Sequence, residues 1–516
     1  MHERTRAIAA GLNKHAMLLL ILLGIAVRVV GFPHVPSGIN QDEAITAYNA
    51  FTLLHEGVEP YEGYTAPVNL LSWHVGSAVA AGVAMIPSIW LFGMSPLGIR
   101  LPFLIAGCIS LPLFYLFLRR LFSKRVAVFG LFLLAISPWH ISISRWALDG
   151  NLLPAFLLAG GLLLAYAENT IMLFSASVLL GLSVYAYGPG CLVSPLLFCI
   201  TLPFLIRKKE QLPGAIGAIL LYLFIVTPMA LYVLMNTQIL PFETLHFGPI
   251  TIPRLYAPSR FMTEGFFHSQ TWLQTLGRNF WQELSLLLTQ DDGTIYNTLP
   301  SFGVMYGPGM IASFAGVFAL FWGMRSNLNK PRIILVVWLI ASLAVGATLS
   351  VNVNRFNAIW LPLIACGGIG LDLLCRYPRI LQVAIAYFLL WFIAFLHAYF
   401  IGYRENIARS FQADIYGAIH AVHRLVPRGP LCITDQARGV NVYVLAAGEV
   451  PSPEFRLALK ENTEMKSIGR YTIGLSSCDP NVQGYVVTQN EFRYFHGMGE
   501  NVRVESFGDY VAVTPK

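Results

Sequence analysis

Long runs of uncharged, apolar residues constrain this chain more than any other feature. Segments 213–235 and 379–401 both run without a charge in their centres. A helix that crosses a bilayer needs about 20 mostly apolar residues, and a soluble core does not repeat such runs so often. Only 12% of the residues are charged, whereas soluble domains carry roughly 25%. The chain is therefore predicted to be a polytopic α-helical membrane protein.

The number of spans depends on one segment, 76–93. The candidate spans lie at 15–32, 76–93, 100–118, 126–142, 152–168, 170–187, 190–206, 213–235, 307–324, 332–350, 356–374 and 379–401. Glycines and Pro87 interrupt the segment 76–93, as in a re-entrant or interfacial piece. If this segment does not span, about 11 transmembrane helices remain.

The positive-inside rule favours the arrangement without 76–93. In that arrangement the N-terminus and the segments 119–125, 207–209, 325–332 and 376–379, which are rich in Lys and Arg, all face the cytoplasm. If 76–93 spans, the last four clusters all move outside. The protein is therefore predicted to lie in the cell membrane as a multi-pass protein with a cytoplasmic N-terminus.

This topology places the polar loops on the outer face. The outer loops are 33–99, 143–151, 236–306 and 351–355, and residues 1–403 form the membrane module. Residues 404–516 are predicted to form a small extracytoplasmic α/β domain, with a helix at 411–425 and strands at 430–434, 471–475, 484–488 and 510–513. In this domain Cys432 and Cys478 are candidates for a disulfide.

Adjacent carboxylates, Asp42 and Glu43, lie in the first outer loop. One interpretation is structural: Asp42 caps a helix at 43–54, and Glu43 lies at its positive end. The other is catalytic: one acid is a general base that removes a proton from an attacking hydroxyl. The two interpretations are compatible, because a capping position also holds a carboxylate rigidly.

The second outer loop contains Arg145 four residues before Asp149. The two could form a structural ion pair. Ionisable residues at membrane depth are also functional candidates, and an arginine suits a bidentate contact with phosphate. Because Asp42 is predicted on the same face, these residues indicate a site for a phosphate-bearing lipid.

Several short motifs, taken in order, resemble one enzyme family. They are Gln41-Asp42-Glu43-Ala44 with Tyr48, Gly57 and Pro67; Leu97-Gly98-Ile99-Arg100-Leu101-Pro102; Ser137-Pro138 with Ser144-Arg145 and Asp149; Asn297 with Pro300 and Gly303; and Asn354-Arg355-Phe356 with Pro362. Over most of residues 15–400 the chain resembles the GT-C glycosyltransferases, especially the protein O-mannosyltransferase and aminoarabinose-transferase superfamily. Residues 64–69 lack the Glu-Lys pair that aminoarabinose transferases carry before a proline, which argues against that donor.

The resemblance implies a GT-C fold and an inverting transfer from a polyprenyl-phosphate sugar to a hydroxyl of a glycan, lipid or protein. It implies Asp42 as the base, Glu43 as a support for the loop or the acceptor, and Asp149 as a second acid. Arg145 would bind the donor phosphate. Arg355 would bind the phosphate or the sugar, with a structural role as the equal alternative.

Further substrate-binding candidates are Tyr48, Tyr64, His74, His246 and Asn297, all on the predicted outer face. A divalent metal is an open alternative, but no ligand spacing demands one. Nucleic acid is not expected as a partner, since the basic residues are confined to short loops.

Two other classes of function compete with the enzyme. A transporter or flippase of lipid-linked sugars would show internal repeats and ionisable residues at the membrane midplane, whereas the charges here lie at the ends of the spans. A non-catalytic envelope assembly protein would use the first-loop acids only as a helix cap.

Overall fold

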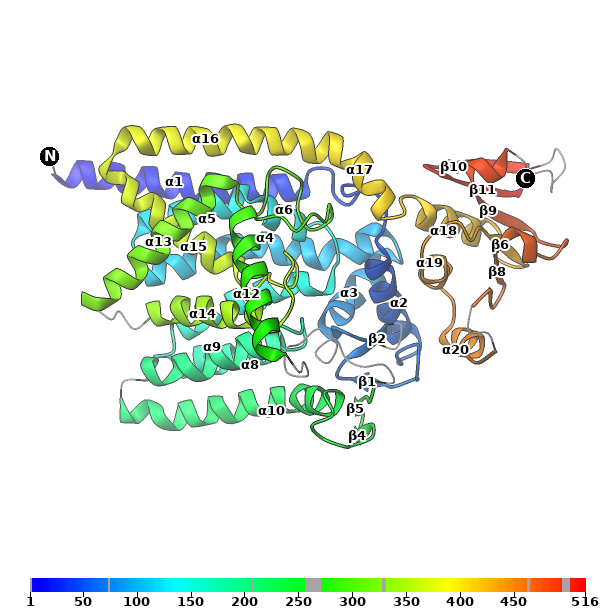
Figure 1. Cartoon of the computed structure of the whole chain (residues 1–516), viewed down its shortest axis with the longest axis horizontal. Coiled ribbons are helices and arrows are strands. Elements are labelled where there is room, and N and C mark those ends of the chain that lie inside the picture. Colours follow the sequence, from blue (N-terminus) through cyan, green and yellow to red (C-terminus); the bar gives the residue numbers. More distant parts are fainter. Residues whose placement is uncertain are drawn as a thin grey trace.

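The apolar runs form helices that lie side by side in a bundle (Figure 1). The computed structural model describes residues 2–72, 75–206, 208–255, 271–326, 331–461, 465–493 and 502–516. The helices of the bundle are α1 (His2–Val29), α4 (Pro96–Leu121), α5 (Lys124–Ile136), α7 (Leu153–Leu164), α8 (Thr170–Ser183), α9 (Gly190–Leu205), α10 (Leu212–Asn236), α13 (Gly307–Ser326), α14 (Arg332–Thr348), α15 (Trp360–Leu373) and α16 (Pro378–His397).

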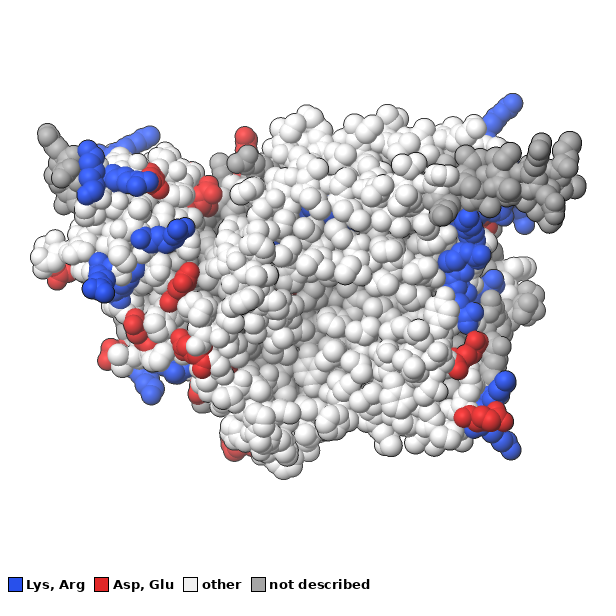
Figure 2. Space-filling view, turned by 180° about the vertical axis from the view of Figure 1, so that it is seen from behind, with Lys and Arg blue, Asp and Glu red and all other residues white. Residues whose placement is uncertain are grey.

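The bundle has the surface of a membrane-embedded body. Three segments of the described chain are long and apolar enough to cross a membrane by length and composition, namely Pro96–Leu121, Lys209–Asn236 and Pro378–Gly402, and shorter apolar helices lie beside them. Large apolar side chains point outward; Phe224 on α10 is 78% exposed. Figure 2 shows a wide band almost without charged residues across the face of the bundle that it draws. The protein is therefore a multi-pass membrane protein.

Basic residues gather at the end of the bundle farthest from the C-terminal domain (Figure 2). Two of the predicted cytoplasmic clusters are linked there to other elements. Arg125 forms an ion pair with Asp372 at 3.0 Å, and Arg332 donates a hydrogen bond to the carbonyl of Leu121 at 3.2 Å. The clusters that the positive-inside argument assigned to one side of the membrane thus lie together.

At the opposite end the bundle is covered by the loop 33–99, the first of the predicted outer loops (Figure 1). This loop forms α2 (Gln41–His55), α3 (Val79–Phe92) and the short strands β1 (Ala66–Pro67), β2 (Leu70–Ser72) and β3 (Val75–Ser77). Strand β1 pairs in parallel with β5 (Ile250–Ile252), which pairs antiparallel with β4 (Leu245–Phe247). The two large outer loops therefore form one small sheet.

Two helices of the outer loops do not run with the bundle. Helix α3, in the segment 76–93, lies beside α2 (Figure 1). Its 14 residues extend about 21 Å at 1.5 Å each, a length similar to that of the bundle helices α8 and α15. Helix α12 (Trp272–Thr289) crosses the bundle helices (Figure 1), and it exposes Trp281 and Leu273 while it buries Glu283.

The residues after α16 lead through α17 (Tyr403–Ser410) into an α/β domain, as predicted. Its sheet has the order β10-β11-β9-β6-β8-β7, in which β6 (Leu431–Ile433) pairs in parallel with β8 (Tyr471–Ile473) and β9 (Gly484–Thr488). The other strands are β7 (Ser467–Ile468), β10 (Val502–Phe507) and β11 (Tyr510–Pro515). Its helices are α18 (Ile415–Leu425), α19 (Val440–Ala447), α20 (Ser452–Glu461) and α21 (Gln489–Phe492). The predicted helix 411–425 begins four residues later, at Ile415.

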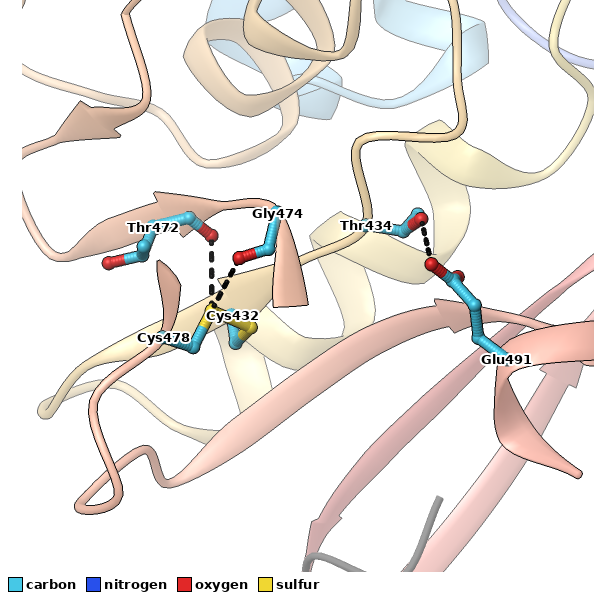
Figure 3. The surroundings of a disulfide bond; sticks show 6 residues. All are labelled: Cys432, Thr434, Thr472, Gly474, Cys478 and Glu491. Atoms are coloured by element: carbon cyan, nitrogen blue, oxygen red, sulfur yellow. Dashed lines mark hydrogen bonds between the residues drawn. A yellow bond between two sulfur atoms is a disulfide. The ribbon is translucent and has the colours of Figure 1, made fainter. Parts of the chain in front are cut away.

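The predicted disulfide is present between Cys432 and Cys478, with 5.9 Å between the Cα atoms. Figure 3 shows it at β6, with the carbonyls of Thr472 and Gly474 directed at Cys478. The bond links β6 to the segment that follows β8. The chain between the two cysteines, which contains α19 and α20, therefore forms a closed loop.

Replacing both Cys432 and Cys478 by Ala is expected to destabilise the C-terminal domain by about 2–4 kcal/mol, because the cross-link removes conformational freedom from a long unfolded loop. Limited proteolysis of the full-length protein, followed over temperature, measures this effect. Cys199→Ala, which removes an exposed free thiol of the bundle, is the control. Equal cleavage temperatures for all three proteins would contradict the prediction.

The C-terminal domain rests on α2. The hydroxyl of Tyr48 donates a hydrogen bond to the carbonyl of Val450 at 2.9 Å. The ring of Phe455 lies 5.9 Å from that of Tyr48 and 5.0 Å from that of Tyr61, centre to centre. Because Tyr48 and Phe455 are buried, the first outer loop and the C-terminal domain share one packed interface.

Candidate active site

Helix α2 begins with a complete capping box. The Asn40 side chain accepts a hydrogen bond from the backbone N–H of Asp42 at 2.8 Å, and the Glu43 carboxylate accepts one from that of Asn40 at 2.9 Å. The cap is therefore Asn40, and the interpretation of Asp42 as the cap is wrong. Asp42 lies in the first turn with an exposed side chain, where the helix dipole favours a negative charge.

Glu43 is buried and fully engaged. Its carboxylate receives two hydrogen bonds from Arg100, from Nε at 2.8 Å and from Nη2 at 2.7 Å, and another from the backbone N–H of Ala147 at 2.7 Å. Glu43 thus joins α2, α4 and the second outer loop, which fits the predicted supporting role. No role was predicted for Arg100, although an arginine at the end of an apolar segment is a signal for a buried partner.

Arg145 lies away from any open surface. Its Nη1 donates hydrogen bonds to the carbonyls of Val27 at 3.0 Å and Arg28 at 2.5 Å, and its Nε donates one to that of Val35 at 3.1 Å. Two of these carbonyls belong to the last turn of α1, which has no partners of its own for them. With 0% of its surface exposed, Arg145 holds the end of α1, and the geometry does not favour the predicted phosphate contact.

Asp149 and Arg355 line a single cavity of about 150 Å³. The backbone N–H of Gly150 donates a hydrogen bond to Asp149 Oδ1 at 2.8 Å, and Arg355 Nη1 donates one to Ser350 Oγ at 3.0 Å. Both side chains are half-buried. The cavity thus combines a carboxylate and a guanidinium from two different predicted outer loops.

The rest of the cavity wall was not predicted. Asn69 is 9% exposed, and its Oδ1 has no hydrogen-bond partner among the described residues. Oδ1 and the Tyr232 hydroxyl both lie so close to Gly76 that a Cβ there would collide with them. An unsatisfied buried carbonyl is costly, so a ligand hydroxyl in the cavity would be a favourable partner for Asn69. Tyr185 and Tyr187 add aromatic surface.

The side chain of Asn297, a predicted substrate-binding residue, is hydrogen-bonded within the protein. Its side-chain nitrogen donates a hydrogen bond to Asp292 Oδ2 at 2.6 Å, its oxygen accepts one from Asn354, and Asp292 Oδ2 also accepts one from the backbone N–H of Val353 at 2.9 Å. Asn297 is buried. The network fastens the end of the large outer loop to the segment before Arg355, so Asn297 shapes the cavity wall without lining it.

Tyr48, Tyr64 and His246 do not line the cavity. Tyr48 is buried against the C-terminal domain. Tyr64 and His246 meet in the small outer sheet, with 6.0 Å between ring centres, and His246 Nδ1 lies 3.1 Å from the Thr251 hydroxyl. His74 falls outside the described residues. No group of three His, Cys, Asp or Glu side chains in the described part of the chain is placed to hold a metal ion.

One family model matches the sequence, over residues 85–232. It describes the dolichyl-phosphate-mannose-protein mannosyltransferases. The matched stretch runs from α3 through α10 and includes Arg100, Arg145 and Asp149. No curated protein matches the sequence.

The fold is similar to that of two kinds of protein of known structure. The ArnT protein of Cupriavidus metallidurans in its apo state is 15% identical, with a TM-score of 0.56 over 96% of this chain and 97% of that one. Its complex with undecaprenyl phosphate is 14% identical, with a TM-score of 0.54 over the same shares. The Archaeoglobus fulgidus oligosaccharyltransferase tethered to an acceptor peptide is 12% identical, with a TM-score of 0.51 over 92% of this chain and 69% of that one.

This chain has the GT-C glycosyltransferase fold. The resemblance inferred from the order of the short motifs is thereby confirmed at the level of the fold. Among GT-C proteins, ArnT is matched over nearly its whole length, and the match includes the C-terminal domain.

Proposed function

We propose that this protein is a glycosyltransferase that transfers a sugar from a polyprenyl-phosphate donor to an acceptor hydroxyl, with inversion at the anomeric carbon. The match to the dolichyl-phosphate-mannose family model supports the donor class. So does the similarity to ArnT, which binds undecaprenyl phosphate.

The observation that carries the proposal is the cavity lined by Asp149 and Arg355. The first predicted outer loop contributes Asn69, Gly76 and Ala78 to its wall. A guanidinium suits a phosphate, while a carboxylate and an amide oxygen suit the hydroxyls of a sugar. We therefore assign the donor phosphate to Arg355 rather than to Arg145.

In the proposed reaction Asp42 takes the proton of the acceptor hydroxyl as its oxygen attacks the anomeric carbon. The bond from that carbon to the phosphate oxygen breaks, and polyprenyl phosphate leaves. Because the leaving group is a phosphate monoester dianion, no general acid is needed. The capping box and the buried Glu43–Arg100 pair fix the turn that carries Asp42, as a positioned base requires.

The proposed site faces the outside of the cell, with the N-terminus in the cytoplasm. The basic residues at the opposite end of the bundle support this orientation (Figure 2). The disulfide supports it too, since such bonds persist in oxidising compartments. Residues 404–516 would then form an extracytoplasmic domain.

Replacing Arg355 by Gln is expected to raise the KM for the polyprenyl-phosphate sugar by about 10- to 100-fold, because a charge-assisted contact with phosphate is lost. The assay follows transfer of labelled sugar by the full-length protein in nanodiscs, with a panel of polyprenyl-phosphate sugars as donors. Arg278→Gln is the control, because this exposed arginine on α12 lies outside the cavity. Equal donor KM values for the two variants would contradict the assignment, and no transfer by the wild type from any donor would contradict the proposed function.

A further inference from the structure

A loop of the C-terminal domain reaches the turn that carries Asp42. Residues 434–439 follow β6, and α19 packs on α2 directly after them. At Gly439, where φ is +68°, a Cβ would lie 3.0 Å from the side-chain oxygen of Gln41. Since Gln41 is the neighbour of Asp42, the C-terminal domain contacts the start of α2.

Tyr296 of the large loop 236–306 lies near the same turn, because it packs on Trp146, and the next residue, Ala147, donates its N–H to Glu43. The ring of Tyr296 lies 6.1 Å from that of Trp146, which in turn lies 5.3 Å from that of Phe411, at the entry to the C-terminal domain. Burial and the charges of Asp42 and Asp292 raise the pKa of Tyr296, while the charge of Arg438 lowers it. Asp42, Tyr296 and Arg438 thus come from three parts of the chain that approach the start of α2.

Arg438 is the least constrained of these groups. It is exposed, and in the described part of the chain no hydrogen bond or ion pair engages its guanidinium. Two acids of the same region have partners other than Arg438: Asp292 accepts hydrogen bonds from Asn297 and Val353, and Asp435 accepts one from Gln436 at 2.8 Å. The guanidinium is thus available to a ligand that approaches Asp42.

We propose that Arg438 and Tyr296 form the acceptor subsite of Asp42, and that Arg438 selects an acceptor that carries a phosphate or a carboxylate near the reacting hydroxyl. This inference rests on the proposed function. Arg438 binds the anionic group of the acceptor, Tyr296 forms a hydrogen bond with it, and Asp42 receives the proton. The C-terminal domain is then part of the enzyme's substrate site, on the acceptor side, while the cavity of Asp149 and Arg355 takes the donor.

The test uses the full-length protein in nanodiscs, a polyprenyl-phosphate sugar that the wild type turns over, and a detergent extract of the source organism's cell envelope as the acceptor probe. Arg438→Ala is expected to raise the apparent KM for the extract at least 10-fold, with kcat and the donor KM changed less than 2-fold. Arg438→Lys should recover part of the loss, because it keeps the charge but not the planar fork. Arg428→Ala is the matched control, since this exposed arginine precedes β6 at the opposite edge of the parallel strands.

Two treatments of the extract identify the anionic group. Phosphatase removes phosphomonoesters, and carbodiimide with methylamine caps carboxylates. One of them should lower wild-type transfer to the level of Arg438→Ala and leave that variant unchanged. The subsite is refuted if neither treatment changes wild-type transfer, or if Arg438→Ala and Arg428→Ala share the wild-type KM. If Asp42→Asn abolishes transfer and Arg438→Ala does not affect it, the subsite alone is refuted. If the wild type shows no transfer, the proposed function itself is refuted.

Discussion

Replacing Asp42 by Asn is expected to lower sugar transfer by about 100- to 10,000-fold, the range that a general base contributes. Asn keeps the size of the side chain and the backbone hydrogen bond from residue 42 to Asn40. It cannot accept the acceptor's proton at neutral pH. Because the side chain is exposed, the folded protein should accumulate normally, and the loss should appear in kcat rather than in the donor KM.

The matched control is Glu62→Gln, which neutralises another exposed carboxylate of the same outer loop. It should change transfer less than 2-fold. Single-turnover measurements on both variants, with donor bound before the acceptor is added, separate chemistry from binding. If Asp42→Asn turned over like Glu62→Gln, Asp42 would not be the base, and Asp149 would become the remaining predicted acid.

The partners of Arg100 and Arg145 could not be predicted from the sequence. Arg100 and Arg145 both stand at the ends of apolar segments on the predicted outer face, and both were quoted in family-like motifs. Local sequence cannot tell which one meets Glu43, since residues 57 positions apart meet only through tertiary packing. In the fold Arg100 takes the carboxylate and Arg145 takes the carbonyls of α1.

Only some of the residues that line the cavity could be predicted from the sequence. Topology put Asp149 and Arg355 on one face, because each follows or precedes a recognisable span. The contribution of Asn69 and Tyr232 could not be foreseen, since a cavity wall depends on how α10 and the first loop pack. In the C-terminal domain the strong β patterns were read correctly, whereas α19 and α20 were not predicted.

Replacing Arg100 by Met is expected to destabilise the protein by about 3–5 kcal/mol, the cost of leaving a buried charge unpaired. Besides Glu43, Arg100 donates hydrogen bonds to the carbonyls of Pro33 at 2.8 Å, Pro36 at 2.8 Å and Gly38 at 2.6 Å. All of these acceptors lose their donor together. A large drop in the melting temperature of the detergent-solubilised protein should follow, and Arg100→Lys should not restore it because the bidentate geometry is lost.

Helix α4 supplies its own control. Arg120 also forms an ion pair, with Glu168 at 3.3 Å, but the two side chains are 29% and 60% exposed. An exposed pair contributes about 0–1 kcal/mol, so Arg120→Met should shift the melting temperature far less than Arg100→Met. Similar shifts for the two variants would contradict the importance assigned to burial.

The double variant Glu43→Leu with Arg100→Met distinguishes the cost of an unpaired buried charge from the role of the ion pair in positioning Asp42. Removing both partners leaves no unpaired buried charge, and such replacements are often neutral or stabilising. Here the recovery should be partial, because the carbonyls held by Arg100 and the N–H of Ala147 remain without partners. If Glu43 and Arg100 position Asp42, the double variant should melt at a higher temperature than Arg100→Met and still transfer sugar slowly. Full stability with full activity would mean that the first turn of α2 holds Asp42 through the Asn40 cap alone.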